Sequence, residues 1–256
     1  MKIMKLKEKH AVITGGGTGI GAAIAAALAA EGARITVMGR RLKPLEATAA
    51  VLPQARSEPC DVTDSDSVAA AFDRARAGFG PVDILVNNAG AAASAPFHKL
   101  DVRHWRRMMA VNLDGVFTCT RAVFDEMRGR GWGRIVNVAS TAALKGYAYV
   151  SAYCAAKHGV LGLTRALALE AAKSGITVNA VCPGYTDTDI VRDAVKNIVE
   201  KTGRSIEEVK AEFTRSNPQG RLIQPAEVAD TVAWLCRPES ASITGQAVIV
   251  AGGEVM

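Results

Sequence analysis

The chain of 256 residues has few cysteines, few aromatic residues and only short apolar runs. Its five cysteines are scattered, and an odd number without CxxC spacing argues against both a disulfide framework and a zinc site. We therefore expect no bound metal. No apolar run is long enough to span a membrane. The basic start, MKIMKLKEKH, lacks an apolar signal core, so the sequence predicts a cytoplasmic protein without membrane partners.

A strong charge of one sign is also absent. The net charge is +6, but the basic residues are dispersed, and the densest groups are those of 103–107 and 128–134. We interpret these groups as solvated helix faces, with an anionic ligand as the second interpretation, and we expect no nucleic-acid partner. What is present is apolar: 49% of the residues are hydrophobic, which suffices for the core of one α/β domain.

A glycine-rich turn follows the first apolar run. His10 to Ile13 is a candidate buried strand, and it leads into TGGGTGIG (14–21) and then an alanine-rich helix that Gly32 ends. Strand, glycine turn and helix form the context that a dinucleotide fingerprint requires, because the helix N-terminus offers free N–H groups to a pyrophosphate. The spacing is TGxxxGxG rather than the commoner GxGxxG.

The end of the second expected strand, Arg34 to Met38, carries Gly39-Arg40-Arg41. An NAD site usually has an acidic residue there, which binds the ribose 2′-hydroxyl. Arginine instead binds a 2′-phosphate, so we predict a preference for NADP(H), with NAD(H) possible. The alternative is that Arg40 and Arg41 merely start a surface helix.

Further strands are expected near 56–60, 82–86, 134–138, 176–181 and 246–250, with helical segments between them. This alternation predicts an α/β fold, a Rossmann-type doubly wound parallel sheet with helices on both faces. We expect residues 1–256 to form a single NAD(P)-binding domain, with a small helical lid inserted at 189–218. Ligands of such sheets bind at the carboxyl ends of the strands, where Asp61, NNAG (87–90) and Ser140 would meet.

Ser140 to Lys157 holds the chemically most suggestive pair. Tyr153 and Lys157 are four residues apart on an expected helix and so share one face. An ammonium beside a phenol favours the phenolate, and we expect it to lower the pKa of the tyrosine toward neutrality. The alternative is a surface Tyr and Lys without function. Asn112, inside another expected helix, indicates either a helix bend or a bound water.

These motifs together resemble the short-chain dehydrogenase/reductase family over nearly the whole chain. The resemblance rests on TGGGTGIG (14–21), Asp61, NNAG (87–90), Asn112 in VNLDG, Ser140, YCAAK (153–157) and PGYTDT (183–188). In local sequence, the second half of the chain is most similar to 3-oxoacyl and polyketide ketoreductases.

The resemblance implies a catalytic tetrad. Tyr153 would be the general acid in reduction and the base in oxidation, and Ser140 would hydrogen-bond the carbonyl oxygen. Lys157 would bind the nicotinamide ribose and stabilise the tyrosinate, and Asn112 would hold a water that relays protons. The implied cofactor contacts are Gly15, Thr18, Gly19, Ile20, Gly21, Arg40, Arg41, Asp61, Val62, Asn88, Ala89, Gly90, Tyr153, Lys157, Pro183, Gly184, Thr186 and Thr188.

Two positions depart from the family pattern. The family's common DGG near the C-terminus is Ala251-Gly252-Gly253 here, which affects expected C-terminal contacts rather than the chemistry. The residue before Gly19 is Thr18, where members that prefer NADP often have a basic residue. The family usually forms homotetramers, so we expect one here.

For the substrate, we expect a small carbonyl or alcohol compound. Leu144, Tyr147, Tyr149 and Tyr185 would line its pocket and favour an apolar or aromatic ketone, whereas Lys145, Arg192 and Lys196 could meet an anionic thioester carrier. Reduction of a 3-oxoacyl thioester or related ketone is the first hypothesis, and an NAD-dependent catabolic secondary-alcohol dehydrogenase is the second. A catalytically silent dinucleotide-binding sensor is an alternative of another class, as is a nucleic-acid binder.

Overall fold

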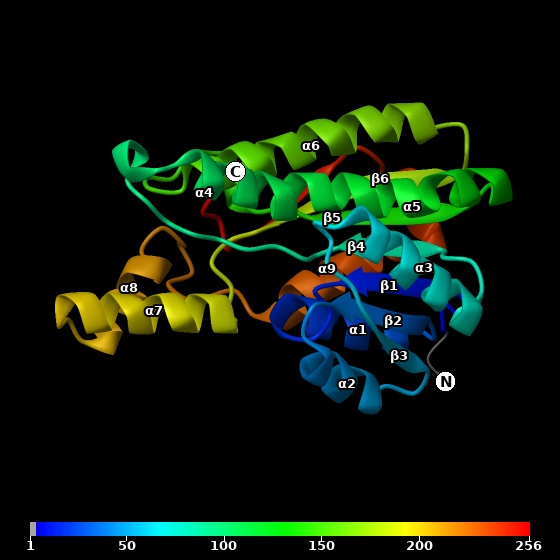
Figure 1. Cartoon of the computed structure of the whole chain (residues 1–256), viewed down its shortest axis with the longest axis horizontal. Helices are drawn as coiled ribbons and strands as arrows, with labels where there is room; N and C mark the ends of the chain where they lie inside the picture. Colours follow the sequence, from blue (N-terminus) through cyan, green and yellow to red (C-terminus); the bar gives the residue numbers. More distant parts are fainter. Residues whose placement is uncertain (1–3) are drawn as a thin grey trace.

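A seven-stranded, wholly parallel sheet forms the centre of the molecule (Figure 1). The computed structural model describes residues 4–256, apart from the side chains of Ile190, Asn197 and Lys201, so the first three residues of the basic start lie outside it. The strand order is β3-β2-β1-β4-β5-β6-β7, which reverses direction between β1 and β4. The predicted doubly wound sheet is confirmed, and such sheets bind ligands at this reversal point.

The strands are β1 (His10–Thr14), β2 (Arg34–Gly39), β3 (Ala55–Pro59), β4 (Ile84–Asn87), β5 (Gly133–Val138), β6 (Ile176–Pro183) and β7 (Ala247–Val250). The α-helices are α1 (Gly19–Ala30), α2 (Leu42–Ala50), α3 (Ser65–Phe79), α4 (Val102–Met109), α5 (Gly115–Arg130), α6 (Ser151–Ala171), α7 (Asp189–Thr202), α8 (Ile206–Thr214) and α9 (Pro225–Cys236). Short helical turns are η1 (Phe97–Lys99), η2 (Ala110–Asp114), η3 (Thr141–Ala143) and η4 (Pro238–Ser240).

Both faces of the sheet are covered, because the strands are apolar on both sides. Successive side chains of a strand point to opposite faces. In β1, Ile13 packs with Leu28 of α1 and Val228 of α9 in one core, whereas Val12 packs with Phe72 of α3 in the other. Figure 1 shows α5 and α6 on one side of the sheet and α1 and α9 on the other.

Several element ends follow local chemistry. Asp64 caps α3 by accepting hydrogen bonds from the amides of Asp66 and Ser67, and Ser205 and Glu208 form a capping box at α8. Two expectations were wrong in detail. The fourth strand begins at Ile84 rather than at residue 82, and the sixth continues past residue 181 to Pro183.

The expected helix that contains Asn112 is divided. Helices α4 and α5 are joined by η2, a π-helical turn that contains Asn112. Such turns occur where a side chain enters the hydrogen-bond ladder of a helix, often at functional sites.

Helices α7 and α8 form the expected insertion, and both lie beyond the carboxyl edge of the sheet, at the left of Figure 1. They share a small core of their own, in which Val191, Val195 and Val209 are buried. None of the helices described within residues 4–256 is long and apolar enough to cross a lipid bilayer.

Candidate active site

Helix α6 brings Tyr153 and Lys157 together, one turn apart. The Lys157 Nζ atom lies 5.7 Å from the centre of the Tyr153 ring and donates a hydrogen bond of 2.9 Å to the carbonyl oxygen of Val138. Because Val138 ends β5, this bond fixes the lysine to the strand that Ser140 follows. A hydrogen bond joins the side chains of Ser140 and Tyr153. Three of the four expected catalytic side chains therefore meet at the carboxyl end of β5.

Burial controls the protonation of this pair. It raises the pKa of Tyr153 to about 12, against the hydrogen bond from Ser140, which lowers it. Burial also lowers the pKa of Lys157 to about 8. The expected lowering of the tyrosine pKa by the lysine is therefore wrong for the protein alone, because desolvation of the phenolate outweighs the attraction. At neutral pH Tyr153 is a protonated donor, and Lys157 is still largely charged.

Asn112 is fully buried and is bound to the backbone on two sides. Its amide nitrogen donates to the carbonyl oxygens of Ala91 (2.9 Å) and Met108 (3.0 Å), and its carbonyl oxygen accepts from the amide of Ala91 (3.2 Å). A side chain at Gly90 would place its Cβ 2.9 Å from the Asn112 Oδ1 atom and 3.8 Å from the Lys157 Nζ atom. Gly90 therefore lies between Asn112 and Lys157, and the helix bend expected at Asn112 is present as the π turn.

The glycine turn folds into a tight cradle. Gly19 has φ +53°, a conformation that favours glycine, and a Cβ at Gly21 would approach the carbonyl oxygen of Gly15 to 2.2 Å. A side chain at Gly19 would also meet the Thr188 methyl group at 3.1 Å. The turn thus leaves its backbone open to a ligand and lies against the segment that follows β6.

Thr14 ties this turn to the NNAG segment after β4. Its hydroxyl oxygen accepts hydrogen bonds from the amides of Asn88 and Ala89, both at 3.0 Å. The Asn88 side chain donates to the carbonyl oxygens of Thr14 (2.9 Å) and Gly15 (3.1 Å). The structure therefore brings the two predicted motifs together across β1 and β4, at the reversal of strand order.

A hollow of about 460 Å³ lies at the ends of β2 and β3. It is lined by Arg40, Pro59, Cys60, Asp61, Ser67, Ala70 and Arg74. The pKa of Asp61 is lowered, first by hydrogen bonds from Thr63 and also by the charge of Arg40. Within residues 4–256, no carboxylate forms an ion pair with Arg40 or Arg41.

These features fit a nicotinamide dinucleotide, because the glycine cradle suits a pyrophosphate and the hollow beside Arg40 suits an adenosine. The other predicted contacts border the same edge. Thr18 precedes α1, Ile20 is in it, Val62 packs against Gly115, Pro183 ends β6, and Thr188 precedes α7. Thr186 is buried, and its hydroxyl donates to the carbonyl oxygen of Gly184 (3.0 Å).

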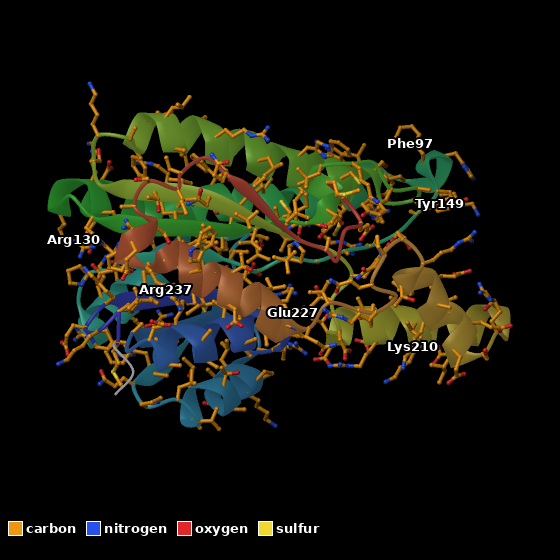
Figure 2. The ribbon with its side chains drawn as sticks, turned by 180° about the vertical axis from the view of Figure 1, so that it is seen from behind. Phe97, Arg130, Tyr149, Lys210, Glu227 and Arg237 are labelled. Atoms are coloured by element: carbon orange, nitrogen blue, oxygen red, sulfur yellow. The ribbon has the colours of Figure 1, made fainter. Side chains whose placement is uncertain are left out.

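The predicted substrate residues separate into two groups. The rings of Tyr147 and Tyr185 are in edge contact at 6.3 Å, and Tyr185 makes an edge contact of 4.9 Å with Phe213 of α8. Leu144 packs against the core below α6. Tyr149, in contrast, is 65% exposed and lies near Phe97 at the surface in Figure 2, so the structure does not place it in this aromatic wall.

Two of the three basic residues expected to meet an anionic carrier already have carboxylate partners. The Arg192 guanidinium binds the carboxylates of Asp187 (2.7 Å) and Asp189 (2.9 Å). Lys145 lies 3.2 Å from Glu254. Lys196 is exposed on α7.

Glu254 is the residue that sequence reasoning missed. Its side chain is only 1% exposed, and it accepts hydrogen bonds from Tyr147 (2.5 Å) and Ser216 (3.0 Å). A Cβ at Gly184 would lie 3.0 Å from its other carboxylate oxygen. The sequence contained one signal: Glu254 is the single charged side chain of 241–256. It directly follows Ala251-Gly252-Gly253, the stretch that departs from the family's DGG pattern.

Comparisons with known proteins agree with this geometry. A family model described as short chain dehydrogenase matches residues 9–199. The acetoacetyl-CoA reductase of Rhizobium meliloti (strain 1021) is 41% identical over 250 residues, covering 96% of this chain and 98% of the relative. The cis-4-hydroxycyclohexanecarboxylate dehydrogenase of Sinomonas cyclohexanicum is 42% identical over 251 residues, covering 96% of each chain.

Among solved structures, an actinorhodin polyketide ketoreductase variant with NADPH superposes with a TM-score of 0.93 at 39% identity, covering 99% of both chains. The sheet, the site and these relatives lead to one assignment: the chain belongs to the short chain dehydrogenase family and is an NAD(P)-dependent oxidoreductase that acts on CH–OH or ketone groups.

Proposed function

We propose that this protein is an NADP(H)-dependent ketone reductase whose first substrate class is a 3-oxoacyl thioester or a related ketone. The observation that carries the proposal is the meeting of Ser140, Tyr153 and Lys157 at the end of β5. A nicotinamide dinucleotide in the cradle beside them would supply the hydride. Relatives named acetoacetyl-CoA reductase and polyketide ketoreductase support the substrate class.

The two hydroxyl groups serve the carbonyl oxygen. When the carbonyl carbon is reduced, negative charge develops on its oxygen, and a donor already aimed at that oxygen stabilises the transition state. Ser140 is that donor, and Tyr153 gives the proton as general acid. Burial raises the pKa of Tyr153 to about 12, so the phenol carries its proton at neutral pH, as a general acid must.

Lys157 and Asn112 position and supply the proton. The Lys157 ammonium, held by the carbonyl oxygen of Val138, stabilises the tyrosinate that is left after proton transfer. Its pKa of about 8 is close enough to neutral for it to pass on a proton. Asn112, next to it across Gly90, would hold the water through which Lys157 is reprotonated.

The cofactor preference rests on the end of β2. Arg40 borders the hollow beside Asp61, and neither Arg40 nor Arg41 pairs with a carboxylate within the described part of the chain. An unpaired guanidinium is the group that binds a 2′-phosphate well. Arg40, Arg41 and the cradle residues Gly15 to Gly21 would therefore hold NADP(H).

The lid, the assembly and the location are part of the same proposal. Helices α7 and α8 would cover the substrate, with Phe213 of α8 touching Tyr185. Exposed apolar side chains on α5 and α6, Phe117 and Leu169, support a homotetramer joined through these helices. All five cysteines are free thiols, which suits the reducing cytoplasm.

A substrate and cofactor panel tests the proposal. The purified protein is assayed with ethyl acetoacetate, acetoacetyl-CoA and cyclohexanone, each with NADPH and NADH, at the nicotinamide absorbance. We expect reduction of the 3-oxo compounds with a higher kcat/KM for NADPH. A preference for NADH with turnover only of secondary alcohols would favour the second candidate, a catabolic dehydrogenase. The Sinomonas relative, which is named as a dehydrogenase, supports this candidate. Binding of NADPH without any turnover would identify a sensor.

A further inference from the structure

A buried carboxylate forms part of the pocket wall that the aromatic residues make. The side chain of Glu254 is 1% exposed, although it lies in the C-terminal segment after β7. A carboxylate is buried only where charged or hydrogen-bonding partners compensate for its lost hydration. The partners of the Glu254 carboxylate therefore indicate the role of this residue in the wall.

Two segments supply those partners. Tyr147 and Lys145 come from the loop between Ser140 and Tyr153, at 2.5 Å and 3.2 Å from the Glu254 Oε1 atom, and Ser216 follows α8. Tyr147 has one phenolic O–H group, which donates its hydrogen bond to the Glu254 carboxylate. The hydrogen bond between Tyr147 and Thr141 (2.7 Å) must therefore be donated by the Thr141 hydroxyl and accepted by the phenolic oxygen. The chain of hydrogen bonds thus runs from Glu254 to the residue directly after Ser140.

This cluster lies beside the place where we expect the substrate to bind. Tyr147 touches Tyr185, which follows the end of β6, and the Glu254 Oε2 atom lies 3.0 Å from where a Cβ of Gly184 would be. Pro183 and Gly184 border the expected nicotinamide site, and Ser140 and Tyr153 border it from the other side. A substrate that reaches Tyr153 therefore passes this wall.

Lys145 is a cation of this wall that could bind a substrate carboxylate. Its side chain is 37% exposed, and its ammonium lies over the Tyr147 ring, 4.9 Å from the ring centre. Glu254 holds it at 3.2 Å. While this pair is intact, an entering carboxylate must compete with a fixed internal one and meets its negative charge.

We propose that Glu254 is a specificity-determining residue: by occupying Lys145, it excludes substrates with a free carboxylate near the ketone and admits neutral ketones and thioesters. This inference rests on the proposed ketone reductase function. It separates two chemistries found among the relatives, one named for a CoA thioester and one for a carboxylate.

The first test measures binding without turnover. Calorimetry on the NADPH-saturated protein compares butyrate with its uncharged analogue butyramide, for the wild type and for Glu254→Gln. The amide keeps the shape and a hydrogen-bond acceptor for Tyr147 but frees Lys145. We expect the ratio of butyrate to butyramide affinity to rise about fivefold, the size of a partly exposed ion pair.

Two further variants separate this role from a structural one. Tyr147→Phe removes a hydrogen bond to Glu254 but keeps the ion pair, and we expect no rise in the ratio. Glu254→Gln combined with Lys145→Gln should lose the gain seen with Glu254→Gln alone. A purely structural role would weaken both ligands equally in every variant, and an unchanged ratio in Glu254→Gln would overturn the proposal.

The second test is kinetic and uses a matched pair of ketones, acetoacetate and ethyl acetoacetate. We expect Glu254→Gln to lower the KM for acetoacetate relative to the ester, again about fivefold, with a smaller change in the ratio of kcat values. If the wild type reduces neither the ester nor acetoacetyl-CoA, the proposed function fails, but the butyrate measurement still decides the role of Glu254. A rise in the binding ratio supports that role, and an equal ratio refutes it.

Discussion

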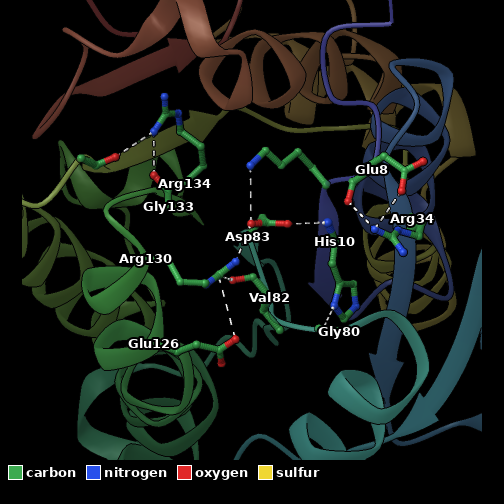
Figure 3. A network of polar contacts seen from close by, with 12 residues as sticks. Glu8, His10, Arg34, Gly80, Val82, Asp83, Glu126, Arg130, Gly133 and Arg134 are labelled. Atoms are coloured by element: carbon green, nitrogen blue, oxygen red, sulfur yellow. Dashed lines mark hydrogen bonds and ion pairs between the residues drawn. The ribbon is translucent and has the colours of Figure 1, made fainter.

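Two buried charges at opposite edges of the sheet, Asp83 and Lys157, differ in their partners. At the amino edge, where the strands begin, Asp83 accepts hydrogen bonds from the His10 amide (2.9 Å) and from Arg130 (2.8 Å), and Lys9 lies 3.7 Å away (Figure 3). Arg130 also donates to the carbonyl oxygen of Val82 (2.5 Å). Asp83 is thus neutralised by two cations, which makes this cluster a structural contact.

At the carboxyl edge, the buried charge of Lys157 has no such partner within the described residues. Lys157 is 4% exposed, yet its ammonium binds the neutral carbonyl oxygen of Val138, and no carboxylate of residues 4–256 forms an ion pair with it. The pKa values of Tyr153 and Lys157 are consequently displaced by burial, to about 12 and about 8. Displaced, unpaired groups in a cleft mark chemistry, whereas paired ones mark stability. Substitutions at the two edges should therefore separate activity from stability.

The largest expected effect is that of Tyr153→Phe. Removing the hydroxyl removes the proton donor, so kcat should fall by about 10²- to 10⁴-fold, the range of general acid catalysis. Stability should be unchanged or slightly higher, because a buried hydroxyl disappears while the ring stays. Steady-state kinetics and thermal unfolding of the same preparations check both parts.

The matched control is Tyr147→Phe, which removes a buried phenol from the neighbouring loop but not the proposed proton donor. Its kcat with a neutral ketone should fall far less than that of Tyr153→Phe. Wild-type kcat in Tyr153→Phe, or an equal loss in the two variants, would contradict the assigned role.

The second effect concerns the cofactor and the carboxyl end of β2. Arg40→Gln keeps a polar side chain, although a shorter one, but loses the charge that would bind a 2′-phosphate. We expect kcat/KM for NADPH to fall about 10- to 100-fold, the loss of a charged hydrogen bond, while the value for NADH changes about twofold or less. Initial rates at varied cofactor concentration measure both.

Arg74→Gln is the control for this hollow. Arg74 borders the same hollow, but its guanidinium already binds Glu58 (2.8 Å) and the carbonyl oxygen of Pro59 (3.0 Å). Its removal should leave the ratio of NADPH to NADH use near that of the wild type. An equal loss of kcat/KM for NADPH in both variants would indicate a general change in the electrostatic potential of the hollow rather than the loss of a 2′-phosphate contact.

The carboxyl edge was largely predictable from the sequence, because its motifs lie at strand ends and a parallel sheet brings those ends together. The positions of Ser140, Tyr153 and Lys157 follow from strand, helix and the four-residue spacing. The pKa of Tyr153 did not follow, since it depends on how strongly the folded chain desolvates the phenol. Glu254 was missed for a similar reason: its burial depends on a tail, a loop and the end of α8 meeting in space.

The amino edge was not predicted, because none of its residues forms a motif. His10, Asp83 and Arg130 are separated by 73 and 47 positions, and nothing in their local sequence says that they meet. Strand register places them side by side: β4 lies beside β1, and β5 beside β4. The same register also explains the wrong start of the fourth strand, since Asp83 is used for these contacts just before β4 begins at Ile84.

The third effect concerns the ion pairs of Asp83 at the amino edge. Asp83→Asn keeps the shape and removes the charge that Lys9 and Arg130 neutralise. We expect the free energy of unfolding to fall by about 1–2 kcal/mol, less than for a fully buried pair because both cations are one-third exposed. Urea unfolding measures this loss, and kcat should remain within about twofold of the wild type.

Asp125→Asn on α5 is the control, because its partners Arg121 and Arg128 are about as exposed as Asp125 itself. Its effect should be no more than a few tenths of a kcal/mol, about the value of a surface pair. A larger loss of stability in Asp125→Asn than in Asp83→Asn would refute the distinction between structural and surface charge.

The smallest effect is a pH dependence that originates at His10. Its imidazole is buried and neutral, with Nδ1 donating to the carbonyl oxygen of Gly80 (2.9 Å) and Nε2 accepting from the Thr36 hydroxyl (2.9 Å). Burial lowers its pKa below 6.5 in the folded chain, against the attraction of Asp83. The unfolded chain therefore binds a proton first, and stability falls as the pH drops from about 6.5 toward the lowered pKa. His10→Gln should remove this slope, a change below about 1 kcal/mol between pH 7 and pH 5, whereas replacing the exposed His98 by Gln should keep it. Urea midpoints at a series of pH values measure both variants, and an equal slope in wild type and His10→Gln would show that the amino edge holds its charges without sensing pH.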